Sequence, residues 1–592
     1  MNTAFETVID VLRARVSHGD DSPGYLFLCD GEAESESLTY RAIDQRSRRI
    51  AAELQQQVAP GARVLLLYPP GLDFIPAFFG CMAAGVIAVP TYAPHPLRPA
   101  RCLPLLEPIA READISAILC TAALAERTML LFREIPALAG APILATDREG
   151  PDATCAGHEP SLDRSTIAFL QYTSGSTAAP KGVMVTHGNL LHNLACIRSG
   201  ADLGSDNAGV SWLPVHHDMG LLGGVLFPLF MGYRSHLMSP VPFVQKPIRW
   251  LAAISRFRAT VSGGPNFAYD LCIQKTTAQQ REGLDLRCWQ LAYNGAEPVR
   301  QTTLDTFAHT FRSCGFRRRS FRPVYGLAES TVLVSGGRLD DDAATGHDAL
   351  CDRADKASAS TDGANRHVSC GRPAADVQVR IVDPERRAAL AEGVVGEIWV
   401  SSPSVARGYW NRPAETAHTF GGFLDDDRTG PFLRTGDLGV IRDGELFVTG
   451  RIKDLIIIRG RKHYPQDIEH VAGSSHPVLE PGSTASFSLS TGDGEKLVIV
   501  AELATRRRRE TSDWEPDDVV GAIRQAVAEQ HELQTHAVVI VPPGGLPRTP
   551  NGKLQRHACR QRFLDGSFEL LACWPCLPVN TGASHDREMA AR

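Results

Sequence analysis

The most informative segment of the sequence reads Tyr172-Thr-Ser-Gly-Ser-Thr-Ala-Ala-Pro-Lys-Gly182, and it directly follows the apolar run Ile167–Leu170. An apolar run of this length is typical of a buried strand, and a helix-like pattern begins at Leu190. Serine, threonine and glycine let a loop present backbone N–H and hydroxyl groups to phosphate oxygens, and Lys181 adds a positive charge. A run rich in serine, threonine and glycine can also be a flexible linker. The order of residues in this segment differs from that of a Walker loop. The position between a strand and a helix favours a phosphate-binding loop.

Short apolar runs alternate with Ala- and Leu-rich helical patterns over about the first 450 residues. The clearest runs are Arg63–Tyr68, Gly85–Pro90 and Ile115–Cys120. This alternation predicts an α/β fold in which helices cover a largely parallel sheet. No internal repeat of fixed period interrupts it.

The pattern restarts after Gly450. An apolar strand is expected over Asp454–Arg459 and a helix from Pro465, followed by strands near Leu497–Ala501 and Ala537–Val541. These elements predict a separate α+β domain of about 120 residues at the C-terminus.

Composition excludes several classes of protein. The chain has 592 residues and a net charge of -6, which gives no general attraction for nucleic acid or anionic membranes. The longest apolar runs, Met82–Pro90 and Gly224–Met231, are too short to span a bilayer. The N-terminus lacks the basic and apolar regions of a secretory signal, and the fourteen scattered cysteines suit reduced thiols. We therefore expect a cytoplasmic protein.

Two local features have ordinary explanations. Cys573 and Cys576 have the spacing of a redox motif but lie in a C-terminal tail, so a packing pair or an unstructured tail is the preferred interpretation. The basic runs Arg317–Arg319 and Arg506–Arg509 are interpreted as solvated faces, with a docking patch for an acidic carrier protein as the alternative.

Five further motifs follow the phosphate loop in a fixed order along about 380 residues. They are Asn294-Gly-Ala-Glu-Pro298, Val324-Tyr-Gly-Leu-Ala-Glu-Ser-Thr331, Arg434-Thr-Gly-Asp-Leu438, Gly450-Arg-Ile-Lys-Asp454 and Pro550-Asn-Gly-Lys-Leu-Gln-Arg556. Each motif alone is weak, but together with the phosphate loop they resemble the adenylate-forming superfamily. This superfamily includes acyl-CoA ligases, luciferases and the adenylation domains of peptide synthetases. Ala178 stands where glycine is common, which is a mild departure.

The resemblance implies a role for each motif. The phosphates of ATP would be contacted by Thr173, Ser174, Gly175, Ser176, Thr177 and Lys181, of which Thr173 and Lys181 would also take part in catalysis. Adenine would be contacted by Asn294, Gly295, Ala296 and Glu297, Tyr325 would stack on it beside Gly326, and Glu329 would help to hold Mg²⁺. Asp437 would bind the ribose hydroxyls with Arg451 also at the nucleotide, Lys453 would be the hinge pivot, and Lys553 would be the catalytic lysine. The chemistry requires such residues, because a carboxylate must attack the α-phosphate of ATP and both reactants are anions.

Three segments narrow the resemblance to fatty acyl-AMP ligases. They are Leu213-Pro-Val-His-His-Asp-Met-Gly-Leu-Leu222, Ser262-Gly-Gly-Pro-Asn-Phe-Ala-Tyr269 and Gly460-Arg-Lys-His-Tyr-Pro-Gln-Asp-Ile-Glu469, in which Lys462 replaces an expected asparagine. The resemblance implies that His216, His217, Asp218, Met219, Gly220 and Asn266 line the acyl site. The polar segment 337–367 coincides with an insertion of that subfamily, which would restrain the C-terminal domain and favour transfer to a carrier protein over CoA.

These observations predict an enzyme in two parts. A large N-terminal adenylate-forming domain of layered subdomains (residues 1–449) would be followed by a hinge (450–454), a smaller mobile α+β catalytic lid (455–575) and a tail expected to be flexible (576–592). With ATP and Mg²⁺ it would convert a medium- or long-chain fatty acid to acyl-AMP, and then pass the acyl group to the phosphopantetheine of a separate acyl carrier protein or synthase.

Three alternatives remain open from the sequence. They are a long-chain fatty acyl-CoA ligase, an amino-acid adenylation domain and a non-catalytic nucleotide-binding scaffold. In an adenylation domain, Asp218 would be the candidate partner for the substrate ammonium group. The scaffold requires broken catalytic positions, whereas Lys181, Glu329, Asp437 and Lys553 are all present. The apolar stretch Leu221–Met231 suits an alkyl chain, although such a stretch more often belongs to a core than to a pocket.

Overall fold

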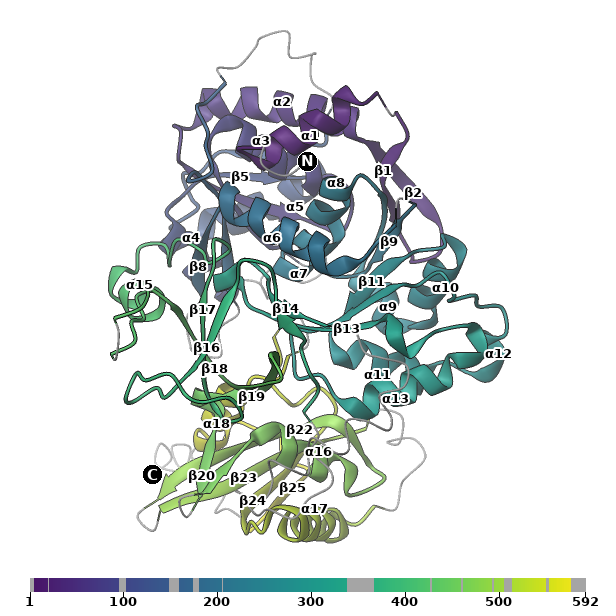
Figure 1. The fold of residues 1–592 in the computed structure, drawn as a ribbon, viewed down its shortest axis with the longest axis vertical. Helices are drawn as coiled ribbons and strands as arrows, with labels where there is room; N and C mark the ends of the chain where they lie inside the picture. Colours follow the sequence, from purple (N-terminus) through teal and green to yellow (C-terminus); the bar gives the residue numbers. More distant parts are fainter. Residues whose placement is uncertain are drawn as a thin grey trace, which may run out of the picture. The chain divides into compact units, whose positions relative to one another are not determined.

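The computed structural model describes residues 5–19, 21–94, 103–148, 159–173, 180–204, 206–337, 367–425, 428–458, 461–491, 494–504, 514–549 and 553–575. The described chain forms two compact units. Unit 1 contains the described residues up to Val448, and unit 2 contains those from Thr449 onward. Each unit combines helices with sheets, as Figure 1 shows, and the predicted α/β fold class is confirmed.

A six-stranded sheet forms the first layer of unit 1. Its strands, in spatial order, are β6 (Ile143–Ala145), β5 (Ile115–Cys120), β3 (Arg63–Tyr68), β4 (Ile87–Tyr92), β7 (Ile167–Thr173) and β8 (Lys181–Thr186). All neighbours are parallel except β7 and β8, which are antiparallel. The expected strands Arg63–Tyr68 and Ile115–Cys120 have the predicted bounds. The strand expected at Gly85–Pro90 begins at Ile87 instead, because Gly85 ends helix α3 (Phe74–Ala84) in the left-handed conformation.

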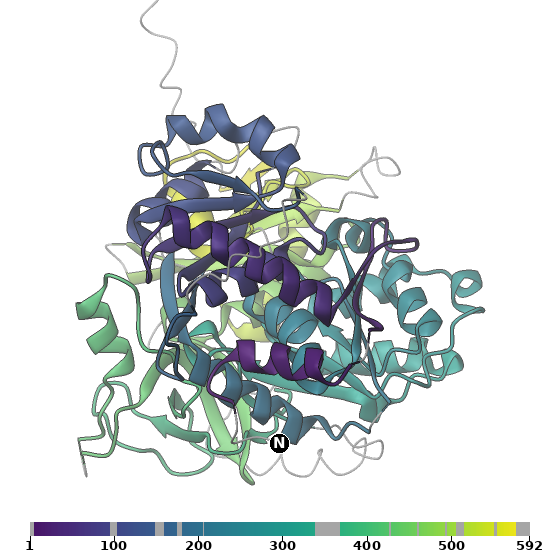
Figure 2. The ribbon, with the colours of Figure 1, turned by 90° about the horizontal axis from the view of Figure 1, so that it is seen from above.

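Both faces of this sheet are buried. In β3, Val64 and Leu66 belong to one hydrophobic cluster, and Leu65 and Leu67 belong to another on the opposite face. The first face is covered by α2 (Tyr40–Gln57), α3 and α6 (His187–Ala201), and the second by α4 (Leu103–Ala113) and α5 (Ala122–Glu134). Helices α1 (Val8–Ser17) and α2, the purple helices of Figure 2, also pack against each other. Burial on both faces explains why the strands read as continuous apolar runs.

A nine-stranded sheet forms the second layer. Its strands, in spatial order, are β15 (Arg372–Pro373), β14 (Leu333–Gly336), β13 (Phe321–Gly326), β12 (Leu291–Asn294), β11 (Val261–Gly264), β9 (Ala208–Ser211), β10 (Arg234–Met238), β1 (Pro23–Leu28) and β2 (Glu34–Thr39). The strands from β13 to β1 are parallel. The motif residues Asn294 and Gly326 therefore lie at the carboxyl ends of neighbouring parallel strands, where α/β sheets commonly bind ligands.

The remaining helices of unit 1 connect or cover these strands. They are α7 (Asp218–Leu221), α8 (Phe227–Met231), α9 (Pro240–Gln245), α10 (Ile248–Arg256), α11 (Asn266–Lys275), α12 (Ala278–Arg281), α13 (Gln301–Thr310) and α15 (Pro413–Phe420), with a π-helical turn at Leu222–Leu226 and 3₁₀ turns at Arg312–Cys314, Arg318–Ser320 and Ala328–Ser330. The apolar stretch Leu221–Met231 is thus helical, and most of its side chains are buried in the core.

A four-stranded sheet completes unit 1. Its strands are β16 (Gln378–Val382), β17 (Gly396–Ser401), β18 (Leu433–Arg442) and β19 (Glu445–Arg451), in that order. The motif Arg434–Leu438 lies at the start of β18.

Unit 2 is an α+β unit around the sheet β22 (Leu479–Thr491), β23 (Gly494–Leu503), β24 (Thr535–Val541) and β25 (Ala572–Trp574). Alternate residues of β23 and β24 face α16 (Pro465–Ser474) and α17 (Pro516–His531), and the others face α18 (Arg556–Leu564). A short hairpin pairs β20 (Ile456–Ile458) with β21 (Arg461–His463). The strand expected from Asp454 starts at Ile456 because Ile452–Asp454 forms a 3₁₀ turn.

Candidate active site

The base of the predicted phosphate loop is a pair of antiparallel strands. Thr173, the last residue of β7, is the register partner of Lys181, the first residue of β8. The two ends of the predicted loop therefore meet at this pair of strands. Ser174, Gly175, Ser176 and Thr177 lie outside the described residues, so their contacts with phosphate stay a prediction.

Lys181 is linked to Glu329 through one aromatic side chain. The Lys181 ammonium group lies 4.8 Å from the centroid of the Tyr409 ring, and the Tyr409 hydroxyl donates a 2.7 Å hydrogen bond to Glu329 Oε1. Burial, and then the Glu329 carboxylate, raise the pKa of the Tyr409 phenol, so the hydroxyl stays protonated and donates a hydrogen bond to the carboxylate. The structure thus brings the predicted phosphate-binding lysine close to the predicted metal-binding carboxylate.

A second group of charges holds the other side of Lys181. Its ammonium group forms an ion pair with Glu415, in the first turn of α15. Arg412, just before that helix, donates to Glu415 at 2.7 Å and to both carboxylate oxygens of Glu112 at 2.9 Å. The side chain of Glu112 is 13% exposed, which makes it a firm anchor for the guanidinium group.

Tyr325 and Asp437 form another buried pair. The Tyr325 hydroxyl donates to Asp437 Oδ2 at 2.8 Å, although 112 positions separate the two residues in sequence. Asp437 is 4% exposed, and its N–H donates to the Thr435 hydroxyl. The predicted adenine-stacking residue and the predicted ribose ligand are therefore held together by a direct hydrogen bond.

The predicted adenine loop follows β12. Asn294 is fully buried, its Nδ2 donates to Asn266 Oδ1, and its Oδ1 has no hydrogen-bond partner among the described residues. Ala296 has a φ of +67°, a conformation that usually selects glycine or asparagine. Glu297 Oε1 accepts a 2.7 Å hydrogen bond from the Phe267 N–H at the start of α11. The Glu297 side chain thus ties the loop to α11.

Gly326 shows why its motif requires glycine. A Cβ atom at this position would lie 1.5 Å from the carbonyl oxygen of Val332. Any side chain would displace this backbone, and with it the neighbouring Tyr325 and Glu329.

The His216–Gly220 segment forms a tight turn into α7. The His216 carbonyl accepts a 3.0 Å hydrogen bond from Gln171 Nε2, and its ring meets the Tyr92 ring edge-on at 4.2 Å. Burial lowers the pKa of His216 to about 3, so the imidazole is neutral at physiological pH. Within the part of the chain that the structure describes, its Nε2 has no hydrogen-bond partner. An uncharged imidazole of this kind is compatible with an apolar substrate.

Asp218 is engaged within the same turn. Its Oδ1 lies 2.5 Å from His217 Nδ1 and accepts a 2.7 Å hydrogen bond from the Met219 N–H. This carboxylate is already committed to the turn, which does not favour its use as the ammonium partner of an amino-acid substrate.

Asn266 has a full set of hydrogen bonds inside the protein. Its Nδ2 donates to Asp270 Oδ2 and to Thr303 Oγ1, and its Oδ1 accepts from Asn294 Nδ2 and from the Arg300 N–H. The contacts with Asn294 and Arg300 hold the predicted adenine loop against α11, and the contact with Thr303 joins α11 to α13. The role of Asn266 in acyl binding stays a prediction.

The residues predicted in the C-terminal part lie in unit 2. Lys453 occupies the 3₁₀ turn after Arg451, and both side chains are exposed. Lys553 is half-buried, and its backbone N–H and carbonyl pair with the Thr549 hydroxyl and N–H. The structure does not describe residues 338–366 of the predicted insertion or the tail from residue 576. The roles predicted for these two segments therefore stay predictions.

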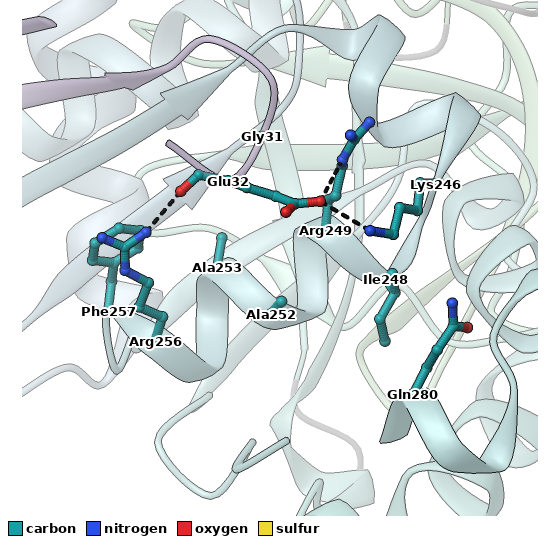
Figure 3. Close-up of a pocket in the computed structure, with 10 residues that line it drawn as sticks. All are labelled: Gly31, Glu32, Lys246, Ile248, Arg249, Ala252, Ala253, Arg256, Phe257 and Gln280. Atoms are coloured by element: carbon teal, nitrogen blue, oxygen red, sulfur yellow. Dashed lines mark hydrogen bonds and ion pairs between the residues drawn. The ribbon is translucent and has the colours of Figure 1, made fainter. Parts of the chain in front are cut away.

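A separate cavity of about 420 Å³ opens elsewhere on unit 1 (Figure 3). Glu32 accepts hydrogen bonds from Lys246 at 3.0 Å and from Arg249 at 2.9 Å at its rim. The carboxylate offsets one of these two positive charges. None of the residues lining the cavity was predicted as a site residue.

Comparison with known proteins places this geometry in a family. The AMP-binding enzyme family matches residues 17–410, which is more than half of the chain. The chain belongs to the AMP-binding enzyme family. The AMP domain of Disco-interacting protein 2-like proteins also matches residues 453–572.

Relatives of this AMP-binding enzyme are similar over nearly their whole length. The medium-chain-fatty-acid–[acyl-carrier-protein] ligase JamA of Moorena producens is 44% identical over 576 residues, which cover 95% of this chain and 96% of JamA. FadD21 of Mycobacterium tuberculosis, named as a fatty-acid–CoA ligase, is 37% identical over 94% of this chain and 98% of its own. The fatty acyl-adenylate ligase of L. pneumophila, solved with acyl adenylate and pyrophosphate, is 39% identical with a TM-score of 0.70, covering 96% and 98% of the two chains. The predicted membership of the fatty acyl-AMP ligase group is confirmed.

The sequence did not predict three residues of the AMP-binding enzyme's candidate site. Tyr409, Arg412 and Glu415 lie more than 220 positions after Lys181 in the chain. No local pattern marks them, because only pairing of the Arg407–Trp410 segment with β8 brings them beside the lysine.

We expect Asp437→Asn to weaken ATP binding about 10- to 100-fold. The carboxylate would lose its charge and could no longer accept hydrogen bonds from both Tyr325 and a ribose hydroxyl, and charge-assisted hydrogen bonds contribute about 1.5–3 kcal/mol each. Isothermal titration of ATP would measure the change. Asp443→Asn, in an exposed turn of the same unit, is the control, and equal affinities for the two variants would contradict the assignment of Asp437.

Proposed function

We propose that this enzyme uses ATP to convert a medium- or long-chain fatty acid to its acyl-adenylate and then passes the acyl group to the phosphopantetheine of a carrier protein. The observation that carries the proposal is the Lys181–Tyr409–Glu329 arrangement, which connects a lysine suited to the leaving pyrophosphate with a carboxylate suited to a metal. The similarity to JamA, an acyl-carrier-protein ligase, supports the acid and the acceptor.

The reaction requires two anions to meet. The substrate carboxylate attacks the α-phosphorus of ATP, an acyl–phosphate bond forms, and the bond to pyrophosphate breaks. Lys181 would neutralise the departing pyrophosphate, and Asp437 would hold the ribose so that the α-phosphate faces the carboxylate. Lys553 would contact the carboxylate and the α-phosphate from the C-terminal domain, with residues 450–454 acting as the hinge.

The donor set suits Mg²⁺ held largely by the nucleotide. Mg²⁺ prefers oxygen ligands and usually keeps several waters while it binds one or two carboxylates and substrate phosphates. Glu329 offers such a carboxylate, and within the described ranges no group of three or more His, Cys, Asp or Glu side chains could form a metal site by itself. When bound, Mg²⁺ would neutralise charge on the phosphate oxygens. Tyr409 would keep Glu329 oriented for this contact.

We infer a cytoplasmic enzyme that meets a separate carrier protein. No helix in the described part of the chain is both long and apolar enough to cross a membrane. Buried cysteines such as Cys81 and Cys120 are free thiols, which supports a reducing compartment.

A fatty acyl-CoA ligase is the second candidate, because FadD21 carries that name. To separate the two, the enzyme is incubated with ATP, Mg²⁺ and a C12–C16 acid, and either CoA or a holo carrier protein is added as acceptor. We expect acyl-AMP followed by an acyl–carrier thioester, with little acyl-CoA. Robust acyl-CoA formation would favour the second candidate, and pyrophosphate release with an amino acid but no fatty acid would contradict both.

A further inference from the structure

The ion pair between Lys181 and Glu415 lies on the lysine that the proposed reaction needs. Glu415 occupies one side of the ammonium group, and the Tyr409 ring, 4.8 Å away, occupies another. The two charged side chains are only partly exposed, at 23% for Lys181 and 39% for Glu415. A phosphate group that binds Lys181 must therefore compete with a carboxylate that is already in contact.

The backbone fixes both partners. Trp410 donates its N–H to the Gly182 carbonyl at 2.8 Å, and Met184 donates to the Gly408 carbonyl at 2.9 Å. The segment before α15 therefore runs along β8 like an additional strand. This pairing sets the position of Lys181 relative to α15, so their ion pair is not an incidental contact between two mobile surface side chains.

Arg412 keeps Glu415 in place. It shares its guanidinium group between Glu415 and Glu112, with donor–acceptor distances of 2.7 and 2.9 Å. If Lys181 swings toward a ligand, Glu415 still has Arg412 as a partner. The Glu415 carboxylate can thus release the lysine and receive it again without being left unpaired.

We propose that Glu415 is a positioning residue that competes with the phosphates of ATP and pyrophosphate for Lys181. This inference rests on the proposed function, because it assigns Lys181 to the pyrophosphate part of ATP. In the nucleotide-free enzyme Glu415 holds the lysine, and on ATP binding the lysine passes to the phosphates. After the acyl-adenylate forms, Glu415 takes the lysine back and so promotes release of pyrophosphate.

The charge state of Glu415 supports the exchange. The hydrogen bonds from Lys181 and then Arg412 lower the pKa of its carboxyl group, so it is a carboxylate throughout the neutral pH range. A fixed negative charge weakens the binding of each phosphate group placed on Lys181, and it does so for ATP and pyrophosphate but not for AMP, which lacks the pyrophosphate part.

The test is the effect of Glu415→Gln on ligands that differ in their phosphates. Glutamine keeps the size of the side chain and an oxygen for Arg412 but removes the charge. We expect the full-length variant to bind ATP and pyrophosphate about 3- to 10-fold more tightly than the wild type, a moderate effect because the pair is partly exposed. AMP, which lacks the pyrophosphate part, should bind with unchanged affinity, and pyrophosphate should inhibit adenylate formation at correspondingly lower concentration.

Three controls distinguish competition from a structural effect. In a Lys181→Met background, Glu415→Gln should leave ATP affinity unchanged, because there is no lysine left to compete for. Asp425→Asn, which removes an exposed partner of Arg387 in the same unit, should change none of the affinities. Glu415→Asp, which keeps the charge, should bind ATP and pyrophosphate with affinities close to those of the wild type.

Several outcomes would overturn the inference. Weaker or unchanged ATP binding by Glu415→Gln would do so, as would an equal change in AMP affinity. The same tightening in the Lys181→Met background would show that Glu415 acts without the lysine. The binding measurements need no acid or carrier, so the inference can fail while the proposed function stands. A wild-type enzyme that binds no ATP would overturn both.

Discussion

Replacing Lys553 by alanine should slow acyl-AMP formation about 10²- to 10³-fold. The proposed role of its ammonium group is to bring the substrate carboxylate and the α-phosphate together, and loss of one preorganised electrostatic donor typically has an effect of this size. The structure gives the side chain a defined base, because the backbone on both sides is tied to Thr549. A single-turnover assay with ATP and a C12–C16 acid, in which acyl-AMP is quenched and quantified, measures the step directly.

The matched control is Lys496→Ala, which removes a lysine from β23 in the same unit. It should form acyl-AMP at the wild-type rate. Lys553→Ala should slow the transfer of preformed acyl-AMP to the carrier much less than it slows adenylation. The reason is that Lys553 is proposed to contact the carboxylate and the α-phosphate during adenylation. A wild-type rate of adenylation in Lys553→Ala would refute the assignment of this lysine.

Replacing Arg556 by leucine should destabilise unit 2 by about 3 kcal/mol. Arg556 donates to both carboxylate oxygens of Glu469 at 2.7 Å and to Asp454 at 3.0 Å. Burial alone would lower the pKa of this guanidinium group, but Glu469 and Asp454 hold it above the usual value. Without Arg556, the Glu469 side chain, 7% exposed, would be a buried carboxylate whose charge is poorly compensated, and breaking such a pair costs about 3–5 kcal/mol.

Hydrogen exchange of the backbone amides in β22, β23 and β24 would measure this loss locally. A change of about 3 kcal/mol corresponds to exchange about 100-fold faster for amides that open with the whole unit. Arg461→Leu is the control, because its pair with Glu532 is exposed on both sides and should contribute less than about 1 kcal/mol. Equal protection in the two variants would show that the Arg556 pair is dispensable.

Two residues of one short segment have different roles: Arg556 stabilises the fold, and Lys553 is proposed to act in the reaction. The motif Pro550–Arg556 was predicted from the sequence as one functional unit. The structure gives its last residue a packing role, since Arg556 ties the start of α18 to α16 and to the turn at Asp454. We therefore expect Arg556→Leu to lower stability, and Lys553→Ala to lower the rate while leaving stability nearly unchanged.

The sequence predicted the strands that are buried on both faces. The runs at Arg63–Tyr68 and Ile115–Cys120 were located with the observed bounds, because a central parallel strand cannot carry exposed polar residues. The ends of strands were less predictable where the backbone conformation of the preceding residues sets them. The positive φ of Gly85 and the 3₁₀ turn at Ile452–Asp454 moved the next strands by two residues each, and neither is visible in an apolar pattern.

The sequence by itself determined the family and the motifs, because chemistry with phosphate requires particular residue types in short ordered segments. Only the tertiary structure decided which charges meet. Lys181 lies beside Tyr409 and Glu415 because the Arg407–Trp410 segment, more than 220 positions later in the chain, pairs with β8. Tyr325 bonds to Asp437 across 112 positions although β13 and β18 belong to different sheets. Contacts between residues so far apart in sequence depend on the register of paired strands and on the packing of separate sheets, which no local pattern records.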